Sequence, residues 1–176
     1  MDPNFRNIGN VDLIDKRAHR VVSVGQGGTL KDYVPFYFTP FSIMMFNIHT
    51  GYNVNQVPNE EIVIIVSSLR KVAELKIPFV FTDQHAYPLM ARYFTDLKDL
   101  KHVDWELLNR RDFRHDPDDP GKKERYQAEA LIWKHLPLQA VLGICSYTED
   151  VNGDIKKELA KRHLNMETHV QRNWYF

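Results

Sequence analysis

One stretch of the sequence, residues 125–133, sets a single acidic side chain among mostly apolar residues. It reads RYQAEALIW, and the carboxylate is Glu129. Apolar neighbours disfavour the ionised form of a carboxylate, so an acid in such a place needs a partner or has a task. Two local structures remain open. As a strand, the stretch places Gln127, Glu129 and Leu131 on one face; as an amphipathic helix, it exposes Glu129 and turns Ile132 toward a core.

Length and charge restrict the class of protein. The length of 176 residues predicts a single domain, residues 1–176. A domain of this size buries about two-thirds of the surface of its unfolded chain. An apolar content of 43% is typical of a globular chain. Because the formal net charge is zero, no global field attracts nucleic acid, and any DNA contact must come from a local surface.

The single cysteine, Cys145, excludes an intramolecular disulfide and is typical of a reducing cytoplasm. It lies in the apolar segment 142–147, which predicts a buried strand and a structural thiol. No apolar run approaches the length that crosses a membrane, and no signal peptide is visible. We therefore expect a cytoplasmic chain with no membrane partner.

Apolar periodicity predicts strands and helices along the rest of the chain. The clearest segment is Ile62–Val66, a continuous run of β-branched residues that predicts a fully buried strand. Further strands are expected at 34–38, 79–81, 143–147 and 166–170. Helices are expected at 11–20, 42–48, 67–76 and 149–164. In the second of these helices, the side chains expected in the core are Met44, Met45 and Phe46.

Three side chains beside these elements could serve a site or have only a structural role. Arg17 lies at the end of the first predicted helix, where a solvated cation is equally suitable. Its planar fork can also hold a phosphate or a carboxylate at two points. His85 follows a predicted strand end, a position that often carries function but also suits a surface histidine. Tyr37 could be a core tyrosine with a bonded hydroxyl.

Five short motifs occur in one order along the chain: GG, DYVPFYF, PFVFTD, YQAE and WYF. They occupy residues 27–28, 32–38, 78–83, 126–129 and 174–176. In that order and at those spacings, the chain resembles the DarT family of bacterial DNA ADP-ribosyltransferase toxins over essentially its whole length. The resemblance implies an α+β fold of the ADP-ribosyltransferase type. Its expected form is a split, mostly antiparallel β core with flanking helices around an NAD cleft.

The resemblance also implies an activity. Family members cleave the nicotinamide–ribose bond of NAD and attach ADP-ribose to a base, commonly thymidine, in single-stranded DNA. The reaction consumes NAD and needs no metal. Such toxins are usually paired with a macrodomain antitoxin that removes the modification. Single-stranded DNA and a macrodomain antitoxin are therefore the expected partners.

Individual residues take their expected roles from the same resemblance. Glu129 corresponds to the catalytic glutamate, Arg17 to a catalytic arginine that also holds NAD, and His85 to an active-site histidine. Tyr37 matches a position near the nicotinamide. The segment before the glutamate strand contacts the target in such enzymes, here through a cation and stacking faces. The expected DNA-binding residues are Arg92, Tyr93 and Phe94.

Two other functions fit parts of the sequence. Asp83, His85 and Glu129 could be ligands of a metal-dependent nuclease, although no paired-ligand spacing supports this. The chain could also be a catalytically impaired module that binds DNA or an antitoxin. Family members carry a further strand and a histidine ahead of the position that matches Asn7, so the short start of this chain predicts weak NAD binding.

Overall fold

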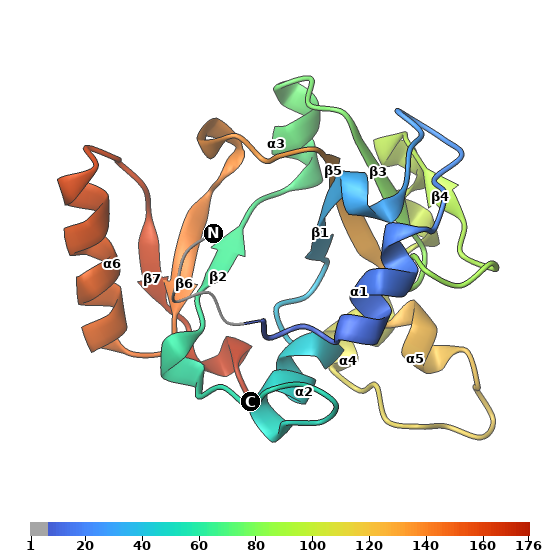
Figure 1. The fold of residues 1–176 in the computed structure, drawn as a ribbon, viewed down its shortest axis with the longest axis horizontal. Coiled ribbons are helices and arrows are strands. Elements are labelled where there is room, and N and C mark those ends of the chain that lie inside the picture. Colours follow the sequence, from blue (N-terminus) through green and yellow to red (C-terminus); the bar gives the residue numbers. More distant parts are fainter. Residues whose placement is uncertain (1–6) are drawn as a thin grey trace.

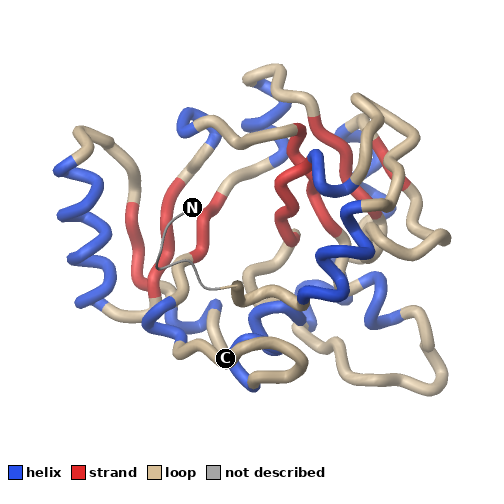
Figure 2. Tube along the Cα trace, viewed as in Figure 1, coloured by secondary structure: helices blue, strands red, loops and turns tan. Residues whose placement is uncertain are grey.

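The computed structural model describes residues 7–176, which form two β-sheets with helices around them (Figure 1). Most of the short start for which weak NAD binding is predicted lies outside this range. The strands of one sheet run in the order β1-β5-β3-β4, and those of the other in the order β2-β6-β7. Figure 2 shows the strands as two separate groups, so the β core is split as expected.

Neighbouring strands of the first sheet are all antiparallel. They are β1 (Tyr33–Tyr37), β5 (Glu129–Trp133), β3 (Phe79–Thr82) and β4 (Tyr93–Phe94). In the second sheet β2 is antiparallel to β6, while β7 is parallel to β6. These strands are β2 (Ile64–Val66), β6 (Gly143–Ser146) and β7 (Thr168–Val170). The predicted mostly antiparallel arrangement is confirmed.

Helices cover the sheets on several sides. They are α1 (Val11–Ala18), α2 (Ile43–Thr50), α3 (Leu69–Glu74), α4 (Trp105–Arg110), α5 (Lys122–Arg125) and α6 (Glu149–Lys161). Figure 1 shows α6 beside β7, and α1 beside the four-stranded sheet. The Asn10 side chain caps α1 by accepting a hydrogen bond from the Leu13 N–H at 2.9 Å. Within residues 7–176, no helix is long and apolar enough to span a bilayer.

Strand β5 is an inner strand of the first sheet, because it pairs with β1 on one side and β3 on the other. Its side chains alternate between two hydrophobic clusters. Leu131 packs with Val22 and Val80 on one face, whereas Ala130 and Ile132 belong to the larger cluster on the other. The strand interpretation of residues 125–133 is thus confirmed from Glu129 onward, and the helical one is wrong.

Strand β2 differs from its prediction. The run Ile62–Val66 was expected to be fully buried, but β2 is an edge strand of the three-stranded sheet. Ile62 is buried, whereas Val63 and Ile65 are 46% and 49% exposed. One face of the strand is therefore covered and the other meets solvent, which a continuous apolar run does not reveal. Of the α2 side chains expected in the core, Met45 is buried, whereas Met44 and Phe46 are 45% and 37% exposed.

The C-terminal residues join the second sheet to its surroundings. The buried Tyr175 hydroxyl lies 3.1 Å from the Ile62 carbonyl oxygen and 3.0 Å from that of Cys145. It thereby connects the segment that leads into β2 with β6. Cys145 is itself buried, and burial raises the pKa of its thiol. The prediction of a structural cysteine in a strand agrees with this position.

Candidate active site

Glu129 is the first residue of β5 and is only 1% exposed. Its backbone N–H donates a hydrogen bond to the Thr82 hydroxyl at 3.2 Å, and that hydroxyl lies 2.6 Å from the Gln84 carbonyl oxygen. Thr82 ends β3 and is fully buried. One threonine therefore joins the start of the glutamate strand to the loop that follows the neighbouring strand.

The Glu129 carboxylate is neutralised by Arg17 from the last turn of α1. Arg17 Nη1 donates to Glu129 Oε1 at 2.8 Å, and Nη2 donates to Oε2 at 2.7 Å. The Arg17 side chain is 15% exposed, so the pair is largely screened from solvent. Burial lowers the pKa of Arg17, but the hydrogen bond and charge of Glu129 outweigh it, and the net pKa is raised. The two candidate catalytic residues thus form a charged, two-point contact.

The loop after β3 adds a third donor to the carboxylate. The Ala86 N–H donates to Glu129 Oε1 at 3.0 Å, and Ala86 is fully buried. The dry setting predicted for Glu129 is therefore confirmed, and three hydrogen bonds compensate its burial. Glu129 is therefore neither exposed on a helix nor buried without hydrogen-bond partners.

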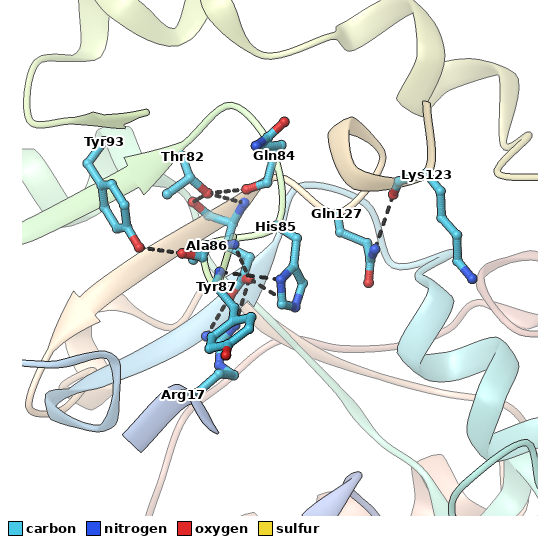
Figure 3. A network of polar contacts seen from close by, with 10 residues as sticks. Arg17, Thr82, Gln84, His85, Ala86, Tyr87, Tyr93, Lys123 and Gln127 are labelled. Atoms are coloured by element: carbon cyan, nitrogen blue, oxygen red, sulfur yellow. Dashed lines mark hydrogen bonds and ion pairs between the residues drawn. The ribbon is translucent and has the colours of Figure 1, made fainter. Parts of the chain in front are cut away.

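His85 lies in the same loop, beside Ala86 and Tyr87 (Figure 3). Its Nε2 is 3.9 Å from Glu129 Oε1. Its Nδ1 accepts a hydrogen bond from the Tyr87 N–H at 3.3 Å, so the neutral ring carries its proton on Nε2. Burial lowers the pKa of His85; the charges of Glu129 and Glu124 oppose the shift and that of Arg17 adds to it. At neutral pH the ring is uncharged, and its N–H faces the carboxylate.

Tyr37 is the residue directly opposite Glu129 in the β1–β5 pairing. Burial raises the pKa of its hydroxyl, and the negative charge of Glu129 raises it further. The phenol is therefore neutral across the physiological range. The structure brings together all four residues predicted for catalysis and NAD binding, namely Arg17, Tyr37, His85 and Glu129.

The predicted DNA-binding residues lie on or next to β4, but they face different ways. Arg92 is exposed, and its Nε donates to Asp83 Oδ2 at 2.6 Å. The Phe94 ring packs on the larger core cluster and stacks on His102 with centroids 5.0 Å apart. Tyr93 packs against the other cluster, and its hydroxyl donates to the Ala86 carbonyl oxygen. Of the three side chains, Arg92 binds Asp83 at the start of the loop after β3, and only Tyr93 binds Ala86, next to His85.

Sequence reasoning missed several groups of this site. Thr82 and Ala86 flank His85 within three residues, and a threonine at the end of an apolar strand is the only visible signal of their role. Arg20 lies two residues beyond the end of α1, and its Nη2 donates to the Pro88 carbonyl oxygen at 3.2 Å. Backbone donors such as the Ala86 N–H leave no trace in a sequence.

The structure does not support the alternative of a metal-dependent nuclease, because two of its three proposed ligands are bound by arginine side chains. Asp83 accepts two hydrogen bonds from Arg92, one from its N–H and one from Nε, and Glu129 is bound by Arg17. Across residues 7–176, no group of three His, Cys, Asp or Glu side chains is arranged to hold a metal ion. The three side chains proposed as ligands, Asp83, His85 and Glu129, therefore do not form a metal site.

Comparisons of the sequence and of the structure with known proteins identify the same family. The family model described as "ssDNA thymidine ADP-ribosyltransferase, DarT" matches residues 1–176. A DNA ADP-ribosyl transferase from Escherichia coli O127:H6 is 56% identical over 174 residues, covering 98% of this chain and 80% of the relative. This chain thus spans about four-fifths of that relative's length.

Two solved structures of Thermus sp. 2.9 DarT have the same fold. One is a complex with ADP-ribosylated single-stranded DNA, with a TM-score of 0.91 and 32% identity over 99% of this chain and 83% of that one. The other is a complex with NAD+, with a TM-score of 0.88 and 31% identity over 100% and 84%. The expected ADP-ribosyltransferase-like fold is confirmed. With a family match over its full length, the chain belongs to the DarT family of single-stranded-DNA thymidine ADP-ribosyltransferases.

Proposed function

We propose that this chain is an NAD-dependent enzyme that transfers ADP-ribose to the base of thymidine in single-stranded DNA. The observation that carries the proposal is the buried two-point contact between Arg17 and Glu129 in a member of the DarT family. The Thermus relative binds NAD+ in one structure and ADP-ribosylated single-stranded DNA in another, which supports the same donor and acceptor here.

Glu129 is the proposed catalytic carboxylate. When the nicotinamide–ribose bond breaks, its electron pair leaves with nicotinamide and positive charge develops on the ribose. A carboxylate held in a dry site stabilises that charge more strongly than it would in water. The base nitrogen then bonds to the ribose carbon and loses its proton, which Glu129 can accept. Three donors, two from Arg17 and one from Ala86, fix the position of this carboxylate.

Arg17 is proposed to hold NAD as well as Glu129. Both of its terminal nitrogens are engaged by the carboxylate, so a substrate phosphate or ribose oxygen must share the guanidinium or displace one contact. Its planar fork suits this exchange, because it can hold two acceptors at once. The neutral His85 can donate from Nε2 beside the carboxylate, and the neutral Tyr37 ring can cover the nicotinamide.

Single-stranded DNA is proposed to run along β4 and the loop before it. With no net charge on the chain, the attraction must be local, and the exposed Arg92 supplies one cation there. Tyr93 and Phe94 remain the proposed aromatic contacts, although both rings already pack on the protein. A base that stacks on either ring therefore has to approach its remaining exposed surface.

Organisation, partner and location are further proposals. Residues 1–176 act as one domain, consistent with α2, which contributes Ile43 to the largest hydrophobic cluster and Met45 to the cluster that holds Ile62 and Tyr175. Membership of the DarT family supports a toxin role and pairing with a macrodomain antitoxin. A single buried thiol and the consumption of NAD support a cytoplasmic setting.

The test uses the purified chain, NAD and two single-stranded oligonucleotides that differ at one position. One carries a single thymidine, and in the other cytidine replaces it. Mass spectrometry should detect one added ADP-ribose on the first oligonucleotide and none on the second. A folded chain that modifies neither oligonucleotide contradicts the proposal, and fluorescence anisotropy with the same DNA then tests the impaired binding module.

A further inference from the structure

The backbone of the loop at residues 85–88 makes hydrogen bonds in two directions: its N–H groups bond to active-site side chains, and its carbonyl groups bond to other side chains. Toward the site, the Ala86 N–H donates to Glu129 and the Tyr87 N–H donates to His85 Nδ1. The Ala86 carbonyl oxygen, in turn, accepts a hydrogen bond from the Tyr93 hydroxyl. Two consecutive peptide groups thus donate hydrogen bonds to Glu129 and His85. Tyr93, from the edge strand β4, binds the carbonyl oxygen of the second of these peptide groups (Figure 3).

A second side chain, Arg20, binds the same loop two residues further on, at Pro88. Arg20 Nη2 donates to the Pro88 carbonyl oxygen at 3.2 Å, and the positive charge of Arg20 acts on the Tyr93 hydroxyl, whose pKa it lowers against the larger effect of burial. In the described part of the chain, Arg20 Nε is buried and has no hydrogen-bond partner. A buried donor without a partner is costly, so the placement of Arg20 against this loop needs a reason.

Peptide planarity connects the Tyr93–Ala86 contact to the Tyr87–His85 contact. The Ala86 carbonyl and the Tyr87 N–H belong to one rigid peptide group, so an atom that fixes the carbonyl also fixes the direction of the N–H. That N–H donates to His85 Nδ1. Because the nitrogen that accepts this bond cannot carry the ring proton, the contact assigns the proton to Nε2, which faces Glu129.

We infer that Tyr93 and Arg20 are positioning residues, which clamp the carbonyls of Ala86 and Pro88 and so set the orientation and tautomer of His85 beside Glu129. The inference rests on the proposed function and assigns the Tyr93 hydroxyl a role distinct from base stacking. A stacking residue needs only its ring, whereas a clamp needs its hydroxyl. Tyr93→Phe separates the two, since it keeps the ring and removes the oxygen.

The kinetic test compares Tyr93→Phe and Tyr93→Ala with the parent chain. For Tyr93→Phe we expect kcat to fall about tenfold, the size of one neutral hydrogen bond of about 1.4 kcal/mol. The KM for NAD and the Kd for a thymidine oligonucleotide should stay within about twofold of the parent, since the ring is kept. Tyr93→Ala should lower kcat at least as much. Tyr52→Phe, at a tyrosine that is 62% exposed, is the matched control and should leave every parameter unchanged.

A second measurement does not depend on activity. Nitrogen chemical shifts of the imidazole ring distinguish the two neutral tautomers of His85, with His85→Gln assigning the signal. The parent should show the proton on Nε2, and Tyr93→Phe should show a mixture of tautomers. Thermal unfolding of each variant reports whether it is folded under the assay conditions.

The outcomes separate this inference from the proposed function. A parent chain that does not modify DNA contradicts the function, while the tautomer measurement still decides the clamp. Parental kcat and an unchanged His85 tautomer in Tyr93→Phe would overturn the clamp. So would a Tyr93→Phe variant with parental kcat beside a Tyr93→Ala variant whose DNA affinity alone is weaker, which is the pattern of a stacking ring.

Discussion

Arg17 and Glu129 lie 112 positions apart in the sequence, yet each terminal nitrogen of the guanidinium meets its own carboxylate oxygen. The contact joins a surface helix, which has no buried residue of its own, to an inner strand of the larger sheet. It compensates the charge of a carboxylate that is only 1% exposed, and it fixes the direction of that carboxylate. It also links catalysis to stability, because neither charge can be removed without leaving the other uncompensated.

Glu129→Ala should therefore destabilise the fold as well as remove activity. Deleting one partner of a buried pair leaves an uncompensated charge, at a cost of about 3–5 kcal/mol in the free energy of unfolding. The double variant Arg17→Met with Glu129→Gln removes both charges and should recover much of that stability. Urea unfolding of the two variants and the parent measures the difference. Equal stability of Glu129→Ala and the parent would mean that the pair contributes nothing to folding.

Arg17→Lys should impair the enzyme although it keeps the positive charge. Lysine can reach one carboxylate oxygen at a time and loses the fork that also serves a second acceptor. The loss of one charge-assisted hydrogen bond corresponds to about 1.5–3 kcal/mol, or roughly ten- to a hundredfold in kcat/KM for NAD. Steady-state kinetics at varied NAD measures this ratio. An unchanged ratio would make Arg17 an ordinary cation at a helix end.

Thr82 gives a prediction about the backbone beneath the site. Thr82→Val keeps the shape of the side chain but removes the acceptor of the Glu129 N–H and the hydroxyl beside the Gln84 carbonyl. Two buried polar groups are then unsatisfied, so we expect a loss of about 1–3 kcal/mol in stability together with a lower kcat. Thr82→Ser retains the hydroxyl and should restore kcat. If valine and serine behave alike, the hydroxyl does not position Glu129.

The lowered pKa of His85 gives a pH dependence of stability with a definite sign. The unfolded chain binds a proton near pH 6.5, the ordinary value, whereas the folded chain resists protonation at this ring until a lower pH. The free energy of unfolding should therefore fall as the pH drops below about 6.5. In His85→Gln this part of the fall should be absent. Chemical denaturation between about pH 7.5 and 5.5 compares the slopes, and equal slopes would contradict the burial of a neutral ring.

The local structure around Glu129 could be predicted from the sequence only in part. An acid in an apolar run indicates burial, but helix and strand have similar patterns over such a short stretch. The pairing of β5 between β1 and β3 decided between them, and that pairing depends on residues about fifty to a hundred positions away. The prediction that β2 is fully buried was wrong for a related reason: a run of apolar residues does not distinguish an edge strand from a central one.

The candidate site was predicted where side-chain identity carries the chemistry. Arg17, Tyr37, His85 and Glu129 could be named because a fork, a ring, an imidazole and a carboxylate suit NAD cleavage in a DarT-like chain. The supporting contacts could not, because the Ala86 N–H and the Pro88 carbonyl are common to every residue type. The different directions of Tyr93 and Phe94 follow from the alternation of β4, which appears only when that two-residue strand is placed.

The most direct test of this account is the single-turnover rate of ADP-ribose transfer to a thymidine oligonucleotide by Glu129→Gln beside the parent chain. Glutamine keeps the size of the side chain but neither stabilises a positive ribose nor accepts the base proton. We predict a rate at least about a hundredfold below that of the parent, with DNA affinity unchanged. A folded Glu129→Gln variant that transfers ADP-ribose at the parental rate would contradict the assignment of Glu129 as the catalytic carboxylate.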